Sequence, residues 1–251
     1  MKALPLTKAN EILAATNQLS QAGGAFVGTD TLEWRKLKRE AEKIVHADPS
    51  VGWSVYAAVM TLAGDIEETN RALRAALPFA IADPSIIEDY MVSKIALGFF
   101  SDALELGKER SSPEYGRFTQ RCSELIVAGG FRTVAAHLLR AAEIGLDVRG
   151  LDVGHVPIAA RLMAEAGLDD EDVAKHLDLA GEVLRNRRLK WSGHPCLCVH
   201  GVDGLFKAVT YVLSVRQSRD EVFEMNCELA DAEVRANVKR HPYFDITFIA
   251  A

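Results

Sequence analysis

Three short stretches of this sequence share one pattern: residues 64–69 read GDIEET, residues 98–103 read GFFSDA and residues 129–134 read GGFRTV. Each begins with glycine, has a large apolar residue two positions later, and has a small or β-branched residue three positions after that. The glycines are 34 and then 31 positions apart, and periods of this size are typical of helical-hairpin arrays. Because glycine ends a helix where the chain turns left-handed, the pattern predicts three stacked hairpins over residues 49–145 with these glycines at their turns.

Proline marks where each hairpin begins. Proline suits the first turn of a helix, and the residue before it resists helical conformation. The three starting pairs are Asp48-Pro49, Asp83-Pro84 and Ser112-Pro113. The first helix of each hairpin is therefore expected over about residues 50–62, 85–97 and 114–128.

The block resembles the tetratricopeptide repeat, over about 100 of the 251 residues. The first unit carries residues of the types that this pattern requires at Trp53, Ala57, Gly64, Leu73 and Ala76. The third unit does so at Phe118, Cys122, Gly129, Leu138 and Ala141, whereas the second matches at Gly98 and Ala103 but departs at Ile87, Met91, Gly107 and Arg110. The resemblance implies a helical stack whose first helices line a concave binding surface.

Composition narrows the class of protein. The net charge of −6 and the pI near 5.7 argue against general nucleic-acid binding. The four cysteines are scattered, which is typical of a reducing compartment. No apolar run is long enough to span a membrane, and no signal peptide follows Lys2, so a cytoplasmic protein is expected.

The flanking regions extend the helical array and then change character. Helices are predicted over residues 6–20 and, after a Thr31 cap, to about His46, with Leu32, Leu37, Ala41, Ile44 and Val45 facing inward. Helices over about 156–166 and 170–187, separated by Gly167, predict a further hairpin. Strands over 196–202 and 205–215, with Asp203-Gly204 between them, predict a β-hairpin whose second strand is central. A Ser218 capping box then opens a helix, and residues 244–250 read as a last strand.

The predicted fold is therefore mostly α. A tetratricopeptide-like array of helical hairpins, residues 1–190, precedes a small β-β-α-β module, residues 191–251.

Three charged clusters have both a structural and a functional interpretation. The basic face of the second helix, with Arg35, Lys36, Lys38, Arg39 and Lys43, is favoured as a solvated face over an anion contact. The acidic run Asp169–Asp172 is favoured as a helix start over a metal site. The basic run Arg185–Trp191 could bind a nucleic acid through Trp191, but a helix end with a buried tryptophan joining the two modules is favoured.

Cysteine and histidine alternate at His194, Cys196, Cys198 and His200. On a strand these residues share a face, but the outer pair would be about 20 Å apart, too far for one zinc ion. Buried structural cysteines are favoured, all four cysteines are expected to be reduced, and no metal or cofactor is predicted. An alternative hypothesis is a catalytic triad with a cysteine nucleophile. It would combine Cys196 or Cys198 with His200 or His241 and with Asp203 or Asp245, but no local sequence motif indicates such a triad.

Three function classes stay open, in this order of preference: a protein-binding or scaffold module, an enzyme or small-ligand sensor using the C-terminal module, and a nucleic-acid-associated factor. The protein-binding class predicts a protein or peptide partner. It makes binding to nucleic acid unlikely, predicts no membrane association, and leaves open whether the protein forms a homo-oligomer. Its sensitive residues would be polar members of the first helices: Glu88, Lys94, Arg117, Gln120, Arg121 and Glu124.

Overall fold

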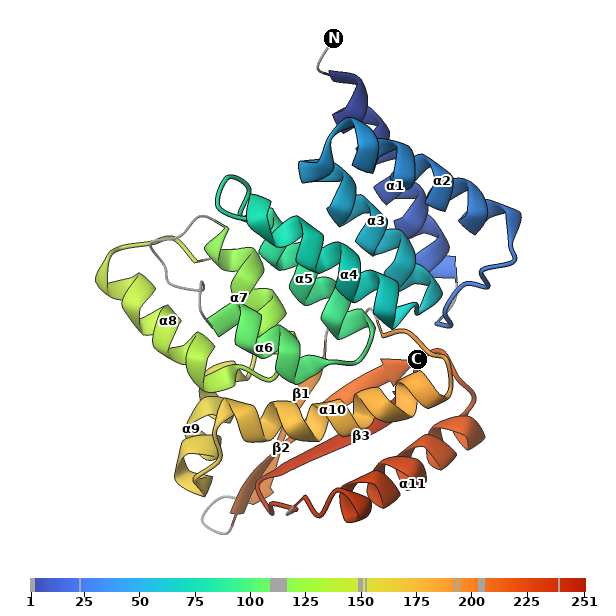
Figure 1. Ribbon diagram of the computed structural model, residues 1–251. Coiled ribbons are helices and arrows are strands. Elements are labelled where there is room, and N and C mark those ends of the chain that lie inside the picture. Colours follow the sequence, from blue (N-terminus) through green and yellow to red (C-terminus); the bar gives the residue numbers. More distant parts are fainter. Residues whose placement is uncertain are drawn as a thin grey trace.

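The computed structural model describes residues 3–22, 24–108, 117–148, 151, 153–191, 193, 195–202, 206–238 and 240–251 (Figure 1). Helices come first: α1 (Ala3–Ala22), α2 (Leu32–Ala47), α3 (Pro49–Ala63), α4 (Ile66–Ala76), α5 (Ser85–Ala96), α6 (Phe100–Lys108), α7 (Phe118–Val127), α8 (Phe131–Glu143), α9 (Val156–Ala166) and α10 (Asp170–Asn186). They are followed by β1 (Cys196–Val202), β2 (Phe206–Val215), α11 (Arg219–Arg235) and β3 (Phe244–Ala250). The structure confirms a mostly helical protein with a small C-terminal α/β module. Among the described residues, no helix has both the length and the apolar character needed to cross a bilayer.

The three predicted hairpins are present. The pair α3/α4 turns at Gly64, α5/α6 at Gly98 and α7/α8 at Gly129, with φ angles of 72°, 74° and 84° that glycine adopts without strain. The first helices α3, α5 and α7 are packed in chain order (Figure 1). Helix α3 begins at Pro49, as the pair Asp48-Pro49 predicted, and the Asp48 side chain caps it. The pair Ser112-Pro113 lies outside the described residues. Assignment of these hairpins to the tetratricopeptide repeat stays a prediction.

The first two helices cover hairpin α3/α4. The Thr31 hydroxyl caps α2 by accepting from the Trp34 main-chain N–H at 3.4 Å. The predicted inward face is wrong at Leu32, which is 74% exposed, while Trp34 is buried and its indole N–H donates to Val59 O at 3.0 Å. The helices α1 to α4 enclose the smaller of the two apolar cores.

The predicted pairing of α9 with α10 as a further hairpin is wrong. Gly167 ends α9 with a φ of 71°, as expected. However, α9 packs on α8 and on strands β1 and β2, whereas α10 packs on α6, α8 and α11. Helix α10 runs across the ends of the hairpins, between them and β3 (Figure 1). Gly181 permits this close crossing, because a Cβ there would lie 2.0 Å from the main-chain oxygen of Gly98.

Two aspartates of α10 cap helices of the array. The Asp178 carboxylate accepts from the main-chain N–H groups of Phe100 and Ser101 at 2.6 and 3.1 Å, at the start of α6. The Asp170 carboxylate accepts from those of Arg132 and Thr133 at 2.9 and 2.8 Å, at the start of α8. These N–H groups have no partner within their own helices, so α10 supplies the caps.

The three strands form one sheet in the order β1-β2-β3. Strands β1 and β2 are antiparallel, with Cys196 opposite Val212, which confirms the predicted strand pair. The expected turn residues Asp203 and Gly204 lie outside the described residues. Strand β3 runs parallel to β2 after the crossover through α11, so β2 is central, as predicted.

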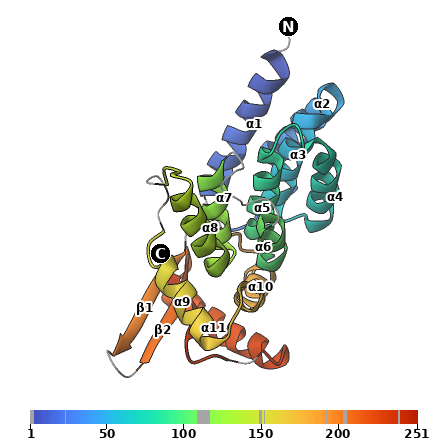
Figure 2. The same ribbon diagram turned by 90° about the vertical axis from the view of Figure 1, so that its left-hand side faces the viewer.

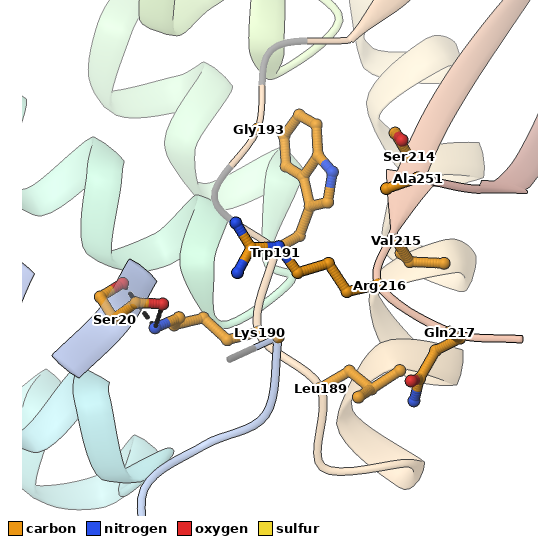
Figure 3. Close-up of a pocket in the computed structure, with 11 residues that line it drawn as sticks. Ser20, Leu189, Lys190, Trp191, Gly193, Ser214, Val215, Arg216, Gln217 and Ala251 are labelled. Carbon is orange, nitrogen blue, oxygen red and sulfur yellow. Dashed lines mark hydrogen bonds between the residues drawn. The ribbon is translucent and has the colours of Figure 1, made fainter. Parts of the chain in front are cut away.

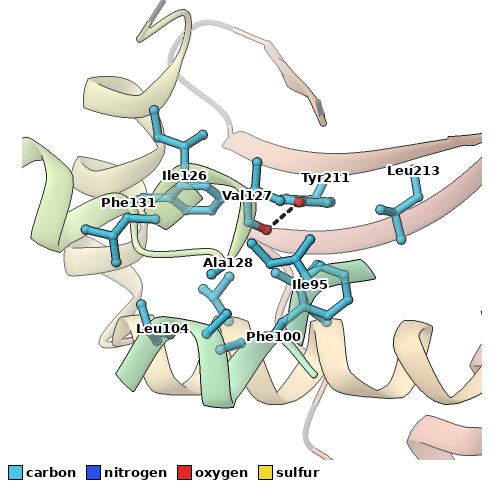
Figure 4. Close-up of a cluster of buried hydrophobic side chains, with 14 of the residues drawn as sticks. Ile95, Phe100, Leu104, Ile126, Val127, Ala128, Phe131, Tyr211 and Leu213 are labelled. Carbon is cyan, nitrogen blue, oxygen red and sulfur yellow. Dashed lines mark hydrogen bonds between the residues drawn. The ribbon is translucent and has the colours of Figure 1, made fainter. Parts of the chain in front are cut away.

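One face of the sheet packs on the helical array (Figure 4). Tyr211 of β2 is fully buried there, its hydroxyl donates to Val127 O at 2.7 Å, and its ring centre lies 6.3 Å from that of Phe131. The larger apolar core continues from Ala76 at the end of α4 to Phe248 in β3. This core crosses residue 190, and the division of the chain into domains at that residue stays a prediction.

Candidate functional site

The structure buries three of the six residues to which the sequence assigned partner binding. Glu88 in α5 and Arg121 in α7 are 3% and 2% exposed. The Glu88 carboxylate accepts from Nη2 of Arg121 at 3.1 Å and lies 2.7 Å from Nε of Arg117. Burial raises the pKa of Glu88, and the charges of Arg117 and Arg121 oppose that rise. This cluster joins two first helices, and Glu88 and Arg121 do not reach the surface.

Lys94 is the third buried candidate. Its Nζ lies 2.6 Å from the Asp102 carboxylate and 5.3 Å from the centre of the Phe99 ring, so it links α5 to α6. Gln120 is exposed and donates to Oε1 of Glu124 at 2.6 Å. Of the six candidates, Glu124 is the one that lines a cavity together with the other first helices.

That cavity has a volume of about 310 Å³ and lies between α1 and the first helices α3, α5 and α7. Its helical lining is rich in small and hydroxyl-bearing side chains, which leave room between the helices. These residues are Thr16, Asn17 and Ser20 of α1, Ala58 and Thr61 of α3, and Ser93 and Ala96 of α5. We call this cavity the inner groove.

A second cavity, of about 260 Å³, adjoins the inner groove and shares Ser20, Lys190, Trp191 and Gly193 with it (Figure 3). It reaches to the end of β2, and we call it the junction cavity. The described residues that line it include two basic side chains, those of Lys190 and Arg216, and the last residue of the sequence, Ala251.

Lys190 is held in place by main-chain pairing between two distant segments. Its N–H donates to Gly24 O at 2.7 Å, and the N–H of Phe26 donates to Arg188 O at 3.0 Å. Lys190 is 7% exposed, and its Nζ donates to the main-chain O and the hydroxyl of Ser20 at 3.2 and 2.5 Å. Burial lowers the pKa of Lys190 to about 8, and no acidic group among the described residues opposes that shift. An ammonium group without a carboxylate partner is rare at such burial.

Trp191 is buried at the junction between the array and the sheet, as the favoured interpretation of its sequence run predicted. It is 2% exposed, and its ring centre lies 6.1 Å from that of Phe100 in α6. Its buried Nε1 has no hydrogen-bond partner among the described residues. Buried tryptophan N–H groups usually find an acceptor, so this unpaired donor is an exception among the described residues.

Among the described residues of the alternative C-terminal site, the cysteines and Asp245 lie on the two outer strands of the sheet. Cys196 is exposed and Cys198 is partly exposed, so the expectation that both are buried is wrong; their sulfur atoms lie 3.6 Å apart. Asp245 and Cys198 are both opposite Thr210 on its two sides, which separates them by two strand spacings, about 10 Å. His241 lies before β3 with its ring centre 5.5 Å from that of Tyr243.

The described residues of this region do not form a candidate metal site. His194 lies outside the described residues. Within the described part of the chain, no three or more histidine, cysteine or acidic side chains form a group that could hold a metal ion. The reduced state of the cysteines and the prediction that no zinc is bound stay predictions.

Sequence reasoning noticed the run Arg185–Trp191 but missed the burial of Lys190 inside it. A lysine near a helix end in a basic run reads as a solvated residue, and its burial depends on α1, which lies 170 positions away along the chain. Trp191, the next residue, was the available signal. Comparisons with protein-family models, curated proteins and solved structures found no match to this chain.

Proposed function

We propose that the protein binds a peptide segment of a partner protein in the inner groove. The observation that carries this proposal is that α1 and all three first helices contribute to one cavity. Hydroxyl and amide side chains such as Thr16, Asn17 and Thr61 can exchange hydrogen bonds with a peptide main chain. The small residues Ala58 and Ala96 make room for its side chains. A groove of this mixed character suits a peptide better than a polyanion, which would need a basic stripe.

A filled groove tests the proposal. Ala58 and Ala96 are partly exposed, so the double change Ala58→Leu and Ala96→Leu adds bulk in the groove without entering the core. The matched control is Ala75→Leu, a partly exposed alanine of α4 that lies outside the lining of the groove. Circular dichroism and thermal melting would establish that all variants fold.

Peptides selected by display from a random library on the wild-type protein would serve as probes, with their Kd measured by calorimetry. We expect the groove variant to weaken binding by about tenfold or more, since about 1.4 kcal/mol corresponds to each factor of ten, and the Ala75→Leu control to bind like wild type. Failure to select any peptide, or equal binding by the groove variant, would reject the proposal.

A further inference from the structure

Ser20 of α1 and Lys190 form a hydroxyl–amine pair at the place where the inner groove and the junction cavity meet. Both residues line both cavities. Nζ of Lys190 lies 2.5 Å from the Ser20 hydroxyl oxygen and 3.2 Å from the Ser20 main-chain oxygen, and Figure 3 shows both bonds. Ser20 is partly exposed, whereas Lys190 is buried. The pair therefore combines a serine at the cavity surface with an enclosed amine.

The surroundings of Lys190 favour a neutral amine. Burial lowers the pKa of Lys190 to about 8. At pH 7 about one molecule in ten then carries a neutral amine, compared with about one in three thousand for a lysine of ordinary pKa. Arg216 and Glu124 are the other charged side chains among the described residues that line the two cavities. A neutral amine has a lone pair, so it can accept the proton of the Ser20 hydroxyl.

The bond between the amine and the hydroxyl is the feature that indicates chemistry. A serine hydroxyl is a weak nucleophile until a base takes its proton. Serine–lysine pairs achieve this in some enzymes without histidine or aspartate. A lysine that only capped the end of α1 would need the bond to the Ser20 main-chain oxygen alone. The second bond, to the hydroxyl, places the amine where a general base must lie.

We infer that Ser20 and Lys190 are a catalytic dyad that hydrolyses a carboxylic ester, with the acyl part of the substrate in one cavity and the alcohol part in the other. The Ser20 oxygen bonds to the carbonyl carbon while its proton passes to Nζ of Lys190. The bond from that carbon to the alcohol oxygen then breaks, and Lys190 gives the proton to the departing alcohol. Water next attacks the acyl-serine, and Lys190 takes a proton from the water and returns it to the Ser20 oxygen as the acid leaves.

The cavities limit the size of the substrate. Their volumes, about 310 and 260 Å³, are near the lower end of the range for small-molecule sites. An ester fits better than an amide, because an alcohol leaves more readily than an amine. The substrate class is therefore a short-chain ester that spans the position of Ser20.

A fluorophosphonate probe tests the nucleophile, because it bonds covalently to an activated serine hydroxyl. The protein is incubated with the probe at about pH 8, and the labelled residue is located by proteolysis and mass spectrometry. We expect Ser20 to be labelled, and Ser123, a partly exposed helical serine outside the lining of both cavities, to stay unlabelled. Lys190→Met should slow the labelling by about a hundredfold or more, whereas Lys175→Met on the exposed face of α10 should not change it.

Hydrolysis of p-nitrophenyl butyrate measures turnover. We expect Ser20→Ala and Lys190→Met each to lower kcat/KM by about a hundredfold or more, and Ser123→Ala to leave it unchanged. If Lys190→Met does not fold, Lys190→Gln replaces it. The inference is overturned if Ser20 is not labelled, if the Lys190 variant is labelled and hydrolyses the ester like wild type, or if Ser20 is labelled but the ester is not hydrolysed.

This inference goes beyond the proposed peptide binding, and the experiments separate the two. Labelling of Ser20 needs no peptide, so failure to select a peptide would leave the dyad standing. Peptide binding by a protein whose Ser20 is not labelled would reject the dyad and leave the peptide proposal standing.

Discussion

Hairpin α3/α4 and the two hairpins that follow it have similar turns, but their second helices are capped in different ways. The Asp65 side chain caps α4 locally and accepts from the main-chain N–H of Glu68 at 3.0 Å. In the other two hairpins the caps are Asp178 for α6 and Asp170 for α8, and both come from α10. The first hairpin satisfies its own helix start, and the next two depend on a distant helix.

The spacing of the two caps explains how one helix serves two hairpins. Asp170 and Asp178 are eight positions apart, which corresponds to about 12 Å along a helix, so their carboxylates reach the starts of two different helices, α8 and α6. Arg185, on the same helix, donates from Nη1 to Leu97 O at 3.2 Å and also to Gly98 O, at the end of α5. Helix α10 therefore holds the second and third hairpins in register, whereas the first is attached mainly through α1, α2 and α5 and through the pairing of residues 24–26 with residues 188–190.

The largest effect is expected where α10 crosses the second hairpin. Gly181→Ala would place a methyl group 2.0 Å from the main-chain O of Gly98, which cannot move without displacing the turn. We expect the free energy of unfolding to fall by about 3 kcal/mol. The control is Gly167→Ala, whose added Cβ meets nothing within 4 Å and whose cost arises only from its φ of 71°, about 1 kcal/mol. Equal losses in urea denaturation of the two variants would contradict the close crossing.

The two kinds of cap give the next prediction. Asp170→Ala removes three hydrogen bonds from a carboxylate that is 3% exposed, to Arg132 N, Thr133 N and Thr133 Oγ1. We expect a loss of about 2–3 kcal/mol. Asp65→Ala removes one local bond and should cost about 1 kcal/mol. Urea denaturation measures both, and hydrogen exchange should show α8 opening selectively in the Asp170 variant. A larger loss for Asp65→Ala would show that the distant caps are not the stronger ones.

The smallest predicted effect is a gain in stability. It concerns Lys190, in the segment 188–190 that pairs with residues 24–26 near the first hairpin. Lys190→Met should raise the free energy of unfolding by about 1 kcal/mol at pH 7, because it replaces a buried ammonium group that has no carboxylate partner. The unfolded chain keeps a lysine pKa near 10.5, while the folded value is about 8. Between pH 8 and pH 10.5 the unfolded state of the wild type binds more protons than its folded state. The free energy of unfolding of the wild type therefore rises with pH relative to that of the variant.

The advantage of Lys190→Met should therefore shrink between pH 8 and pH 10.5. Denaturation of both proteins at pH 7 and at about pH 10 measures this change, with Lys175→Met as the control for loss of an exposed lysine. A variant that is less stable than wild type at pH 7 would show that the bonds to Ser20 outweigh the cost of burying the charge.

Local signals were read correctly where the partner groups lie a few residues apart. Thr31, the Ser218–Glu221 capping box and the three turn glycines act within one helical turn, and each does so in the structure. The acidic run Asp169–Asp172 was also read correctly as a helix start, and in the structure Asp169 and Asp172 form a capping box there. The sequence did not reveal that Asp170 caps α8. Nothing in the local sequence distinguishes an aspartate that caps a distant helix from the acidic residues beside it.

The candidate site was predictable only in outline. The first helices do line the inner groove, but Glu88, Lys94 and Arg121 are used inside the array, because an inner position that is polar needs a partner. Side-chain type alone does not show whether that partner is another helix or a ligand. The small residues Ala58 and Ala96, which open the groove, carry no chemical signal in a sequence.

The sequence by itself determined where most helices begin and end, that three pairs of helices over residues 49–145 form hairpins, and that the C-terminal part forms a sheet. These features depend on backbone conformation and on patterns that repeat over two to four residues. Only the tertiary structure decided that α10 lies across the hairpin ends and that Lys190 is enclosed beside Trp191. The contacts involved join groups 38, 78 and 170 positions apart. Burial and charge balance at such positions depend on which elements become neighbours, and that follows from the packing of the whole chain.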